Sequence, residues 1–129
     1  MKRKKILIID DEHDILAYLK ILFQDEGYDT ITSNCGSDGL EIAKREQPDL
    51  ITLDITMPGQ SGVRTFRYFK QDDALKHIPV IVITATGEST GVFLKNLAGL
   101  PEPDGFIGKP VDKDTLIRLA SDLLSKCAE

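Results

Sequence analysis

The chain has 129 residues, of which 41% are hydrophobic and 29% are charged, so we expect one globular domain over residues 1–129 with a sizeable core. Its 16 basic and 21 acidic residues give a net charge of −5, and only 6% of its residues are aromatic. An acidic, aromatic-poor domain is badly suited to phosphate backbones and stacked bases, so we expect no nucleic-acid binding.

The basic start of the chain is not followed by a membrane segment. Between Lys5 and Asp10 lie only four apolar residues, whereas a signal peptide needs about 7–15 and a membrane span about 20. Cys35 and Cys127 are far apart and form no CxxC or Cys/His cluster, which argues against structural zinc and against a disulfide framework. We therefore expect a cytoplasmic protein with no membrane attachment.

Five short segments have the composition of β-strands. Three are apolar runs rich in β-branched residues, at 6–9, 50–53 and 80–83, and such runs are typical of strands that are covered on both faces. The runs at 30–33 and 105–108 contain fewer apolar residues, so we expect them at the edges of the sheet.

The interval after the first strand has helical spacing of apolar residues. The expected helix buries Ile15, Leu19, Leu22 and Phe23 on one side. Gly27 is expected to stop it, because glycine readily adopts the left-handed conformation that ends helices.

Four more helices are expected after the second, third, fourth and fifth strands. Ser37 is a capping residue for the second helix and Pro48 ends it, the third follows Gly62, the fourth lies within 89–97, and Asp112 caps the last. The apolar sides of the second, third and last helices contain Leu40, Ala43, Val63, Phe66, Phe69, Leu116, Leu119, Ala120, Leu123 and Leu124.

Strands and helices therefore alternate along the whole chain. This alternation predicts an α/β fold with a doubly wound five-stranded parallel sheet and helices on both faces, a three-layer sandwich. The flavodoxin-like strand order 2-1-3-4-5 puts the three apolar strands in the middle. Ligands of such sheets bind beyond the carboxyl ends of the strands.

Polar residues stand at the ends of four predicted strands. Asp10 and Asp11 follow the first strand, Asp54 follows the third, Thr84 ends the fourth and Lys109 follows the fifth. Because the carboxyl ends of parallel strands lie at one edge of the sheet, we expect these five residues to lie close together.

This set of side chains favours phosphoryl transfer. Crowded carboxylates repel one another without a counter-ion, and their oxygens suit Mg²⁺, which usually also binds phosphate. Lys109 and Thr84 can contact phosphoryl oxygens through an ammonium group and a hydroxyl group. Asp54 can act as the nucleophile and become an acyl phosphate.

Four motifs resemble the receiver domain of two-component response regulators, the CheY-like superfamily. They are Ile-Ile-Asp-Asp-Glu at 8–12, Leu-Asp-Ile-Thr-Met-Pro-Gly at 53–59 with Gly62, Ile-Thr-Ala at 83–85 and Phe-Ile-Gly-Lys-Pro at 106–110. Their order and spacing match the family over the whole chain.

The resemblance implies a role for each residue of the site. Asp54 is the phospho-acceptor, charged by a sensor histidine kinase or a phosphotransfer protein. Asp11, Asp54 and the backbone carbonyl of Thr56 bind Mg²⁺ directly, and Asp10 acts largely through a metal-bound water. Lys109 contacts the phosphoryl group.

The resemblance also implies a switch. Thr84 moves toward the phosphoryl group and Phe106 fills the space that Thr84 leaves, which changes the surface made by the last strand and the helices on either side of it. In the family this surface binds a downstream protein target and forms homodimers on phosphorylation. Pro110 stands where the family has a cis peptide bond.

Two features depart from the family pattern. The segment between Thr84 and Lys109 is a few residues longer than usual, and the extra length falls at 100–104, where two prolines argue against a helix. Thr56 and Thr86 occupy positions that influence the lifetime of the phosphoryl group. Neither is an acid or an amide, so we expect no strong water-positioning side chain there.

Other functions fit the pattern less well. A hydrolase of the haloacid dehalogenase type needs a second acid two positions after the nucleophile, where this chain has Thr56. A flavodoxin needs a phosphate loop after the first strand, where the acidic segment 10–14 would repel phosphate. The open alternative is a receiver-like protein-interaction scaffold that does not need phosphorylation.

The two histidines offer no evident catalytic pairing. We expect His13 to be a solvated residue at the start of the first helix and His77 to be exposed in a loop. The domain is therefore not expected to be an enzyme beyond promoting its own phosphoryl transfer and dephosphorylation.

Overall fold

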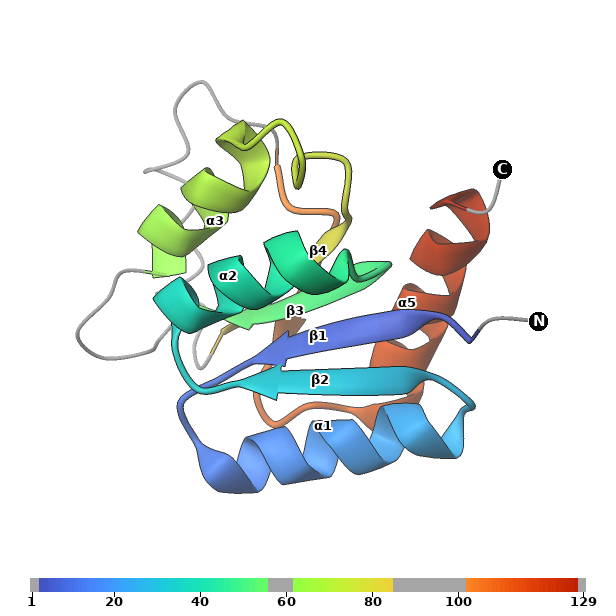
Figure 1. Cartoon of the computed structure of the whole chain (residues 1–129). Helices are drawn as coiled ribbons and strands as arrows, with labels where there is room; N and C mark the ends of the chain where they lie inside the picture. Colours follow the sequence, from blue (N-terminus) through green and yellow to red (C-terminus); the bar gives the residue numbers. More distant parts are fainter. Residues whose placement is uncertain (1–2, 56–61, 85–101, 128–129) are drawn as a thin grey trace.

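The computed structural model describes residues 3–55, 62–84 and 102–127. It contains a five-stranded parallel sheet in the order β2-β1-β3-β4-β5, as predicted (Figure 1). The strands are β1 Lys5–Ile9, β2 Asp29–Ser33, β3 Leu50–Asp54, β4 Val80–Thr84 and β5 Gly105–Gly108. The third strand extends one residue further than predicted, so Asp54 is itself the last residue of β3, whereas β4 ends at Thr84 as predicted.

Four helices lie within the part of the chain that the structure describes. They are α1 His13–Asp25, α2 Gly36–Glu46, α3 Gly62–Gln71 and α5 Lys113–Cys127. The helix expected within 89–97 falls outside the described residues. No helix in the described ranges is both long and apolar enough to cross a lipid bilayer.

Two of the predicted helix boundaries are confirmed. Gly27 follows α1 with a φ of +91°, a left-handed conformation that glycine adopts without steric cost. Asp112 precedes α5, and its Oδ2 atom accepts hydrogen bonds from the backbone N–H and the hydroxyl of Thr115 at 3.0 and 2.7 Å. This is the side-chain contact by which an N-cap residue stabilises a helix start.

The predicted cap of α2 is wrong. The helix begins at Gly36 with Cys35 as its N-cap residue, so Ser37 lies inside the first turn. The hydroxyl of Ser33 donates to the carbonyl of Cys35 at 2.9 Å and lies 3.2 Å from Oδ2 of Asp38. Hydrogen bonds from Ser33, at the end of β2, therefore fix the first turn of α2. The helix begins at Gly36, before Ser37, which was predicted to cap it.

Alternate residues of the central strands face opposite sides of the sheet. In β1, Leu7 and Ile9 belong to the core beneath α2 and α3, whereas Ile6 and Ile8 belong to the core beneath α1 and α5. This two-sided burial explains why the strand sequences are apolar without alternation. Each fully buried isoleucine or leucine contributes about 1.5–3 kcal/mol of hydrophobic stabilisation.

The buried side of α1 differs slightly from the expectation. Leu16, Leu19, Leu22 and Phe23 are buried, and Ile15 only packs against the margin of that core. The predicted spacing identified the buried side of α1 correctly, but the first buried residue is Leu16 and not Ile15.

An ion pair lies at the amino-terminal end of the sheet, beside the starts of β4 and β5. Nζ of Lys70 in α3 lies 3.2 Å from Oδ2 of Asp104 and donates to the carbonyl of Ile78 at 3.1 Å. The same Asp104 oxygen accepts the backbone N–H of Val80 at 2.8 Å. The described part of the longer segment, residues 102–104, is not helical and is fixed to the start of β4.

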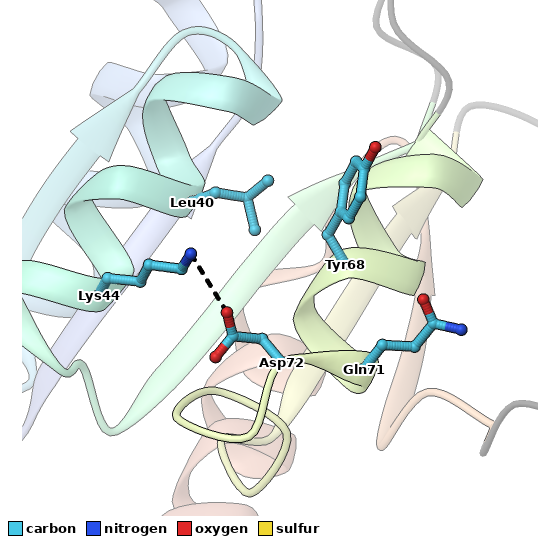
Figure 2. Close-up of a pocket in the computed structure, with 5 residues that line it drawn as sticks. All are labelled: Leu40, Lys44, Tyr68, Gln71 and Asp72. Carbon is cyan, nitrogen blue, oxygen red and sulfur yellow. Dashed lines mark ion pairs between the residues drawn. The ribbon is translucent and has the colours of Figure 1, made fainter.

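The helices α2 and α3 are joined by a second ion pair beside a pocket. Nζ of Lys44 lies 3.2 Å from Oδ2 of Asp72, just beyond the end of α3. The pocket has a volume of about 400 Å³ and is lined by Leu40, Lys44, Tyr68, Gln71 and Asp72 (Figure 2). None of the predicted site residues lines it, so it is separate from the strand-end site.

Candidate functional site

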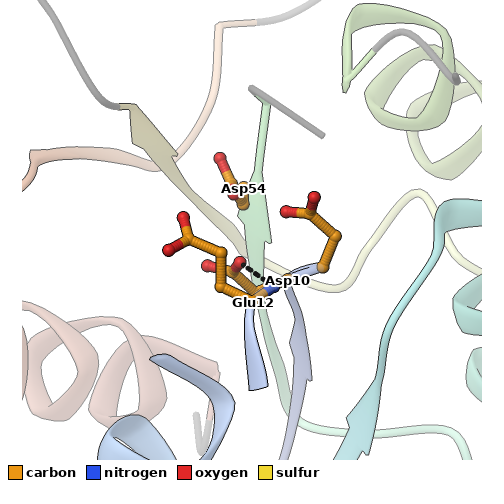
Figure 3. Close-up of side chains that lie close together, drawn as sticks. Asp10, Glu12 and Asp54 are labelled. Carbon is orange, nitrogen blue, oxygen red and sulfur yellow. Dashed lines mark hydrogen bonds between the residues drawn. The ribbon is translucent and has the colours of Figure 1, made fainter. Parts of the chain in front are cut away.

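Four carboxylates meet at the carboxyl edge of the sheet. One oxygen atom each from Asp10, Asp11, Glu12 and Asp54 lies within 4.8 Å of the others. Figure 3 shows that Asp10 and Glu12 come from the segment after β1 and Asp54 from the end of β3. The three aspartates were expected to lie together. We call these four residues the acidic cluster.

Local hydrogen bonds fix the position of Asp10. Its backbone N–H donates to the carbonyl of Ser33 at 3.1 Å, and its Oδ1 atom accepts the backbone N–H of Glu12 at 3.0 Å. The second contact is a short turn of the kind that aspartate commonly forms with the backbone two residues on. As a result the Asp10 side chain is held inward and is only 1% exposed, like that of Asp54.

Lys109 supplies the positive charge of the site. Its backbone N–H donates to the carbonyl of Thr84 at 2.8 Å, which continues the pairing of β4 with β5. Its Nζ atom lies 3.1 Å from Oε1 of Glu12, 3.2 Å from Oδ2 of Asp54 and 3.5 Å from Oδ2 of Asp10. The peptide bond that follows Lys109 is cis.

The electrostatics of Asp10 and Lys109 reflect this crowding. Burial raises the pKa of Asp10 to about 7, the neighbouring Asp54 adds to the rise, and the bond from the Glu12 N–H and the charge of Lys109 oppose it. Burial alone would lower the pKa of Lys109, but the carboxylates of Glu12, Asp54 and Asp10 outweigh it and the pKa is raised. The site therefore favours a shared proton or an added cation.

The acidic cluster fits a magnesium ion. Oδ2 of Asp10 is buried and accepts no hydrogen bond from the described residues. The cluster offers only hard carboxylate oxygens, which Mg²⁺ prefers, and no nitrogen or sulfur ligand. A cation bound there would relieve the repulsion between Asp10 and Asp54.

Thr84 and Phe106 lie on neighbouring strands near the acidic cluster. Thr84 ends β4 and is 4% exposed. Phe106 in β5 is half-buried against the core beneath α2 and α3, and its Cα is paired with that of Val82. Thr56 and Thr86, two other predicted positions, fall outside the described residues.

The sequence predicted no role for Glu12, and it predicted correctly that His13 and His77 are exposed. Glu12 is the third acid of an acidic run at the end of β1, and this run was the available signal for it. His13 is exposed at the start of α1, and His77 is exposed in the loop before β4, as expected.

Comparisons with known proteins agree with this geometry. Residues 6–121 match the family described as the response regulator receiver domain. The chain is 30% identical over 121 residues to protein PilH of Pseudomonas aeruginosa, covering 94% of this chain and 98% of PilH. It is 38% identical over 82 residues to the polar-differentiation response regulator DivK of Brucella anthropi, covering 64% of this chain and 67% of DivK.

Solved structures show the same fold. The signal receiver domain of a signal transduction histidine kinase from Syntrophus aciditrophicus superposes with a TM-score of 0.84 and 29% identity, covering 95% of this chain and 91% of that chain. The matched fold, the family match over most of the chain and the strand-end acidic cluster agree with one another. The chain belongs to the response regulator receiver domain family, the CheY-like domains of two-component signalling, and is not a conventional enzyme.

Proposed function

We propose that this chain is a phosphorylation-dependent switch and that Asp54 is its phospho-acceptor. The observation that carries the proposal is the position of the Asp54 carboxylate at the end of β3, with Oδ2 3.2 Å from Nζ of Lys109. Receiver domains take phosphoryl groups from histidine kinases, so the proposed donor is the phosphohistidine of a sensor kinase or of a phosphotransfer protein.

The proposed reaction is an in-line displacement. A carboxylate oxygen of Asp54 attacks phosphorus, the bond between phosphorus and the donor's imidazole nitrogen breaks, and the electron pair of that bond leaves with the imidazole. Lys109 is already within hydrogen-bond distance of Asp54 and can balance the negative charge of the transferred group.

The acidic cluster is the proposed magnesium site. Asp11, Asp54 and the backbone carbonyl of Thr56 would hold the ion directly, and Asp10 would act through a metal-bound water. The ion supplies charge neutralisation for the carboxylates and for the phosphoryl oxygens. Support comes from the buried Oδ2 of Asp10, which accepts no hydrogen bond from the described residues.

The proposed output is a change in the surface around β5. Thr84 would move toward the phosphoryl group and the Phe106 ring would fill the space that it leaves. Support comes from their positions on adjacent strands, with Thr84 joined through its carbonyl to the backbone of Lys109. The partner would be a downstream protein that binds this surface in the phosphorylated state.

The decisive experiment is phosphorylation with acetyl phosphate and Mg²⁺, followed by intact mass spectrometry. We expect a mass gain of one phosphoryl group in the wild type and none in Asp54→Asn. The matched control is Asp73→Asn, which removes an exposed carboxylate far from the acidic cluster and should be phosphorylated normally. If no phosphodonor or kinase modified the wild type, the protein would instead be a phosphorylation-independent scaffold.

A further inference from the structure

Among the described contacts of the Lys109 ammonium with carboxylates, the shortest is with Glu12, the one member of the acidic cluster that has no proposed role as phospho-acceptor or magnesium ligand. Nζ lies 3.1 Å from Oε1 of Glu12, compared with 3.2 Å to Asp54 and 3.5 Å to Asp10. We propose that Glu12 is a positioning residue that holds Lys109 at the rim of the site and competes with the phosphoryl group for it. This inference rests on the proposed function of Asp54.

The Glu12 side chain is not needed to start α1. Glu12 is the N-cap residue of this helix, but its side chain makes no capping hydrogen bond. Its backbone is held by its neighbours: its N–H donates to Oδ1 of Asp10 at 3.0 Å, and its carbonyl accepts the N–H of Leu16 at 3.0 Å. A change of side chain at this position therefore leaves the described backbone contacts in place.

The position of Lys109 among three carboxylates provides the basis for this competition. An ammonium group has three N–H donors, and in this structure it faces the carboxylates of Glu12, Asp54 and Asp10. A phosphoryl group on Asp54 adds oxygens that also require this ammonium. The Asp54 oxygen that takes the phosphoryl group loses its charge, so the phosphoryl oxygens then compete with Glu12 and Asp10 for the ammonium.

Glu12 is the partner that can be released at the lowest cost. Its side chain is 58% exposed, whereas that of Asp10 is 1% exposed. A carboxylate that turns into water is hydrated again, but a buried carboxylate that loses its cation is left uncompensated. The phosphoryl group would therefore displace Glu12 from Lys109 and leave the contact with Asp10 in place.

Removal of the Glu12 charge should have two opposite effects. The oxygen of Glu12 lies within 4.8 Å of the other oxygens of the acidic cluster, so its loss weakens the attraction for Mg²⁺. Once Mg²⁺ is saturating, however, the freed Lys109 should bind a phosphoryl group more tightly. A purely structural role of Glu12 would produce neither this opposition nor its dependence on charge.

The test is a titration with beryllofluoride, an analogue of the phosphoryl group, followed by NMR of the full chain. The Mg²⁺ affinity of each variant is measured first, so that every titration is carried out at saturating Mg²⁺. The variants are Glu12→Gln, Glu12→Asp, which keeps the charge, and the control Asp14→Asn, which removes an exposed acid in the first turn of α1.

We expect Glu12→Gln to bind beryllofluoride about two- to five-fold more tightly than the wild type, the range that an exposed ion pair can produce. Glu12→Asp should bind like the wild type, and Asp14→Asn should change the affinity less than Glu12→Gln does. An unchanged or weaker affinity in Glu12→Gln, or equal effects in Glu12→Gln and Asp14→Asn, would overturn the role of Glu12 alone. Failure of the wild type to bind beryllofluoride would overturn both this role and the proposed function.

Discussion

Nζ of Lys109 lies 3.2 Å from Oδ2 of Asp54, although the two residues are 55 positions apart in the sequence. The contact exists because β4 pairs with both β3 and β5, so that the ends of these strands are neighbours at one edge of the sheet. It joins a buried carboxylate to a cation that also faces Asp10 and Glu12. The balance between these carboxylates and the single ammonium group therefore determines how the stability of the protein depends on Asp10, on Lys109 and on pH.

The stability of the metal-free protein should fall as the pH rises from about 4 to about 7. Asp10 has a pKa of about 7 in the folded state and an ordinary value of 3.8, so the folded state binds more protons than the unfolded state in this interval. Stability from this group is complete below the lower value and is lost as the pH passes the upper one. Urea unfolding in the presence of a chelator measures the effect.

The matched variant for this pH dependence is Asp10→Asn, which carries no titrating group at this position. We expect its free energy of unfolding to vary less with pH and to exceed that of the wild type by about 1–2 kcal/mol near pH 8. The depressed pKa values of Glu46, Asp72 and Asp112 affect stability only at lower pH. A wild-type profile as flat as that of the variant would contradict the assignment to Asp10.

Replacement of Lys109 by glutamine should destabilise the metal-free protein most strongly at high pH. The change leaves Asp10 and Asp54 buried without their cation, so we expect a loss of about 1–3 kcal/mol near pH 8 and a smaller loss near pH 5, where Asp10 is protonated. Mg²⁺ should bind more tightly to the variant, because a competing positive charge is gone. Calorimetric titration with Mg²⁺ and unfolding at both pH values check these two effects.

The ion pair between Lys70 and Asp104 should support stability without affecting phosphorylation. The Lys70 side chain is 7% exposed, and Asp104 also holds the N–H of Val80, so Asp104→Ala should lower the free energy of unfolding by about 1–3 kcal/mol. The pair lies at the edge of the sheet opposite the acidic cluster, so acetyl phosphate should still modify the folded variant.

The control for this variant is Asp73→Ala, which removes the exposed partner of Lys76. An exposed pair contributes little, and we expect a change below about 1 kcal/mol. Equal losses in the two variants, measured by urea unfolding, would show that the ion pair at Asp104 has no special structural role.

A side chain at Gly62 should disturb the backbone beside the phospho-acceptor. A Cβ atom there would overlap the Cα and carbonyl oxygen of Ile55, the residue after Asp54, and backbone atoms cannot move aside as a flexible side chain can. We expect Gly62→Ala to cost about 1–3 kcal/mol of stability and to slow phosphorylation by acetyl phosphate. Gly108→Ala meets open space and serves as the control for stability, measured as the thermal midpoint.

Much of the fold could be predicted because its signals are local. The apolar runs at 6–9, 50–53 and 80–83 indicate strands that are buried on both faces of the sheet. Because helical patterns separate these strands regularly, only a few strand connections are possible. The parallel topology in turn predicts that Asp10, Asp54 and Lys109 lie at one edge of the sheet. These predictions depend on composition and spacing, which the sequence displays directly.

The tertiary structure decided the features that depend on contacts between distant segments. The start of α2 depends on the hydroxyl of Ser33 at the end of β2, which outweighed the capping signal of Ser37. The pairing of Glu12 with Lys109 joins residues 97 positions apart, and the raised pKa of Asp10 follows from its burial beside Asp54. Burial and charge proximity are properties of the assembled chain, so residue type and spacing could name the acids of the site but not the contacts and protonation that each acquires there.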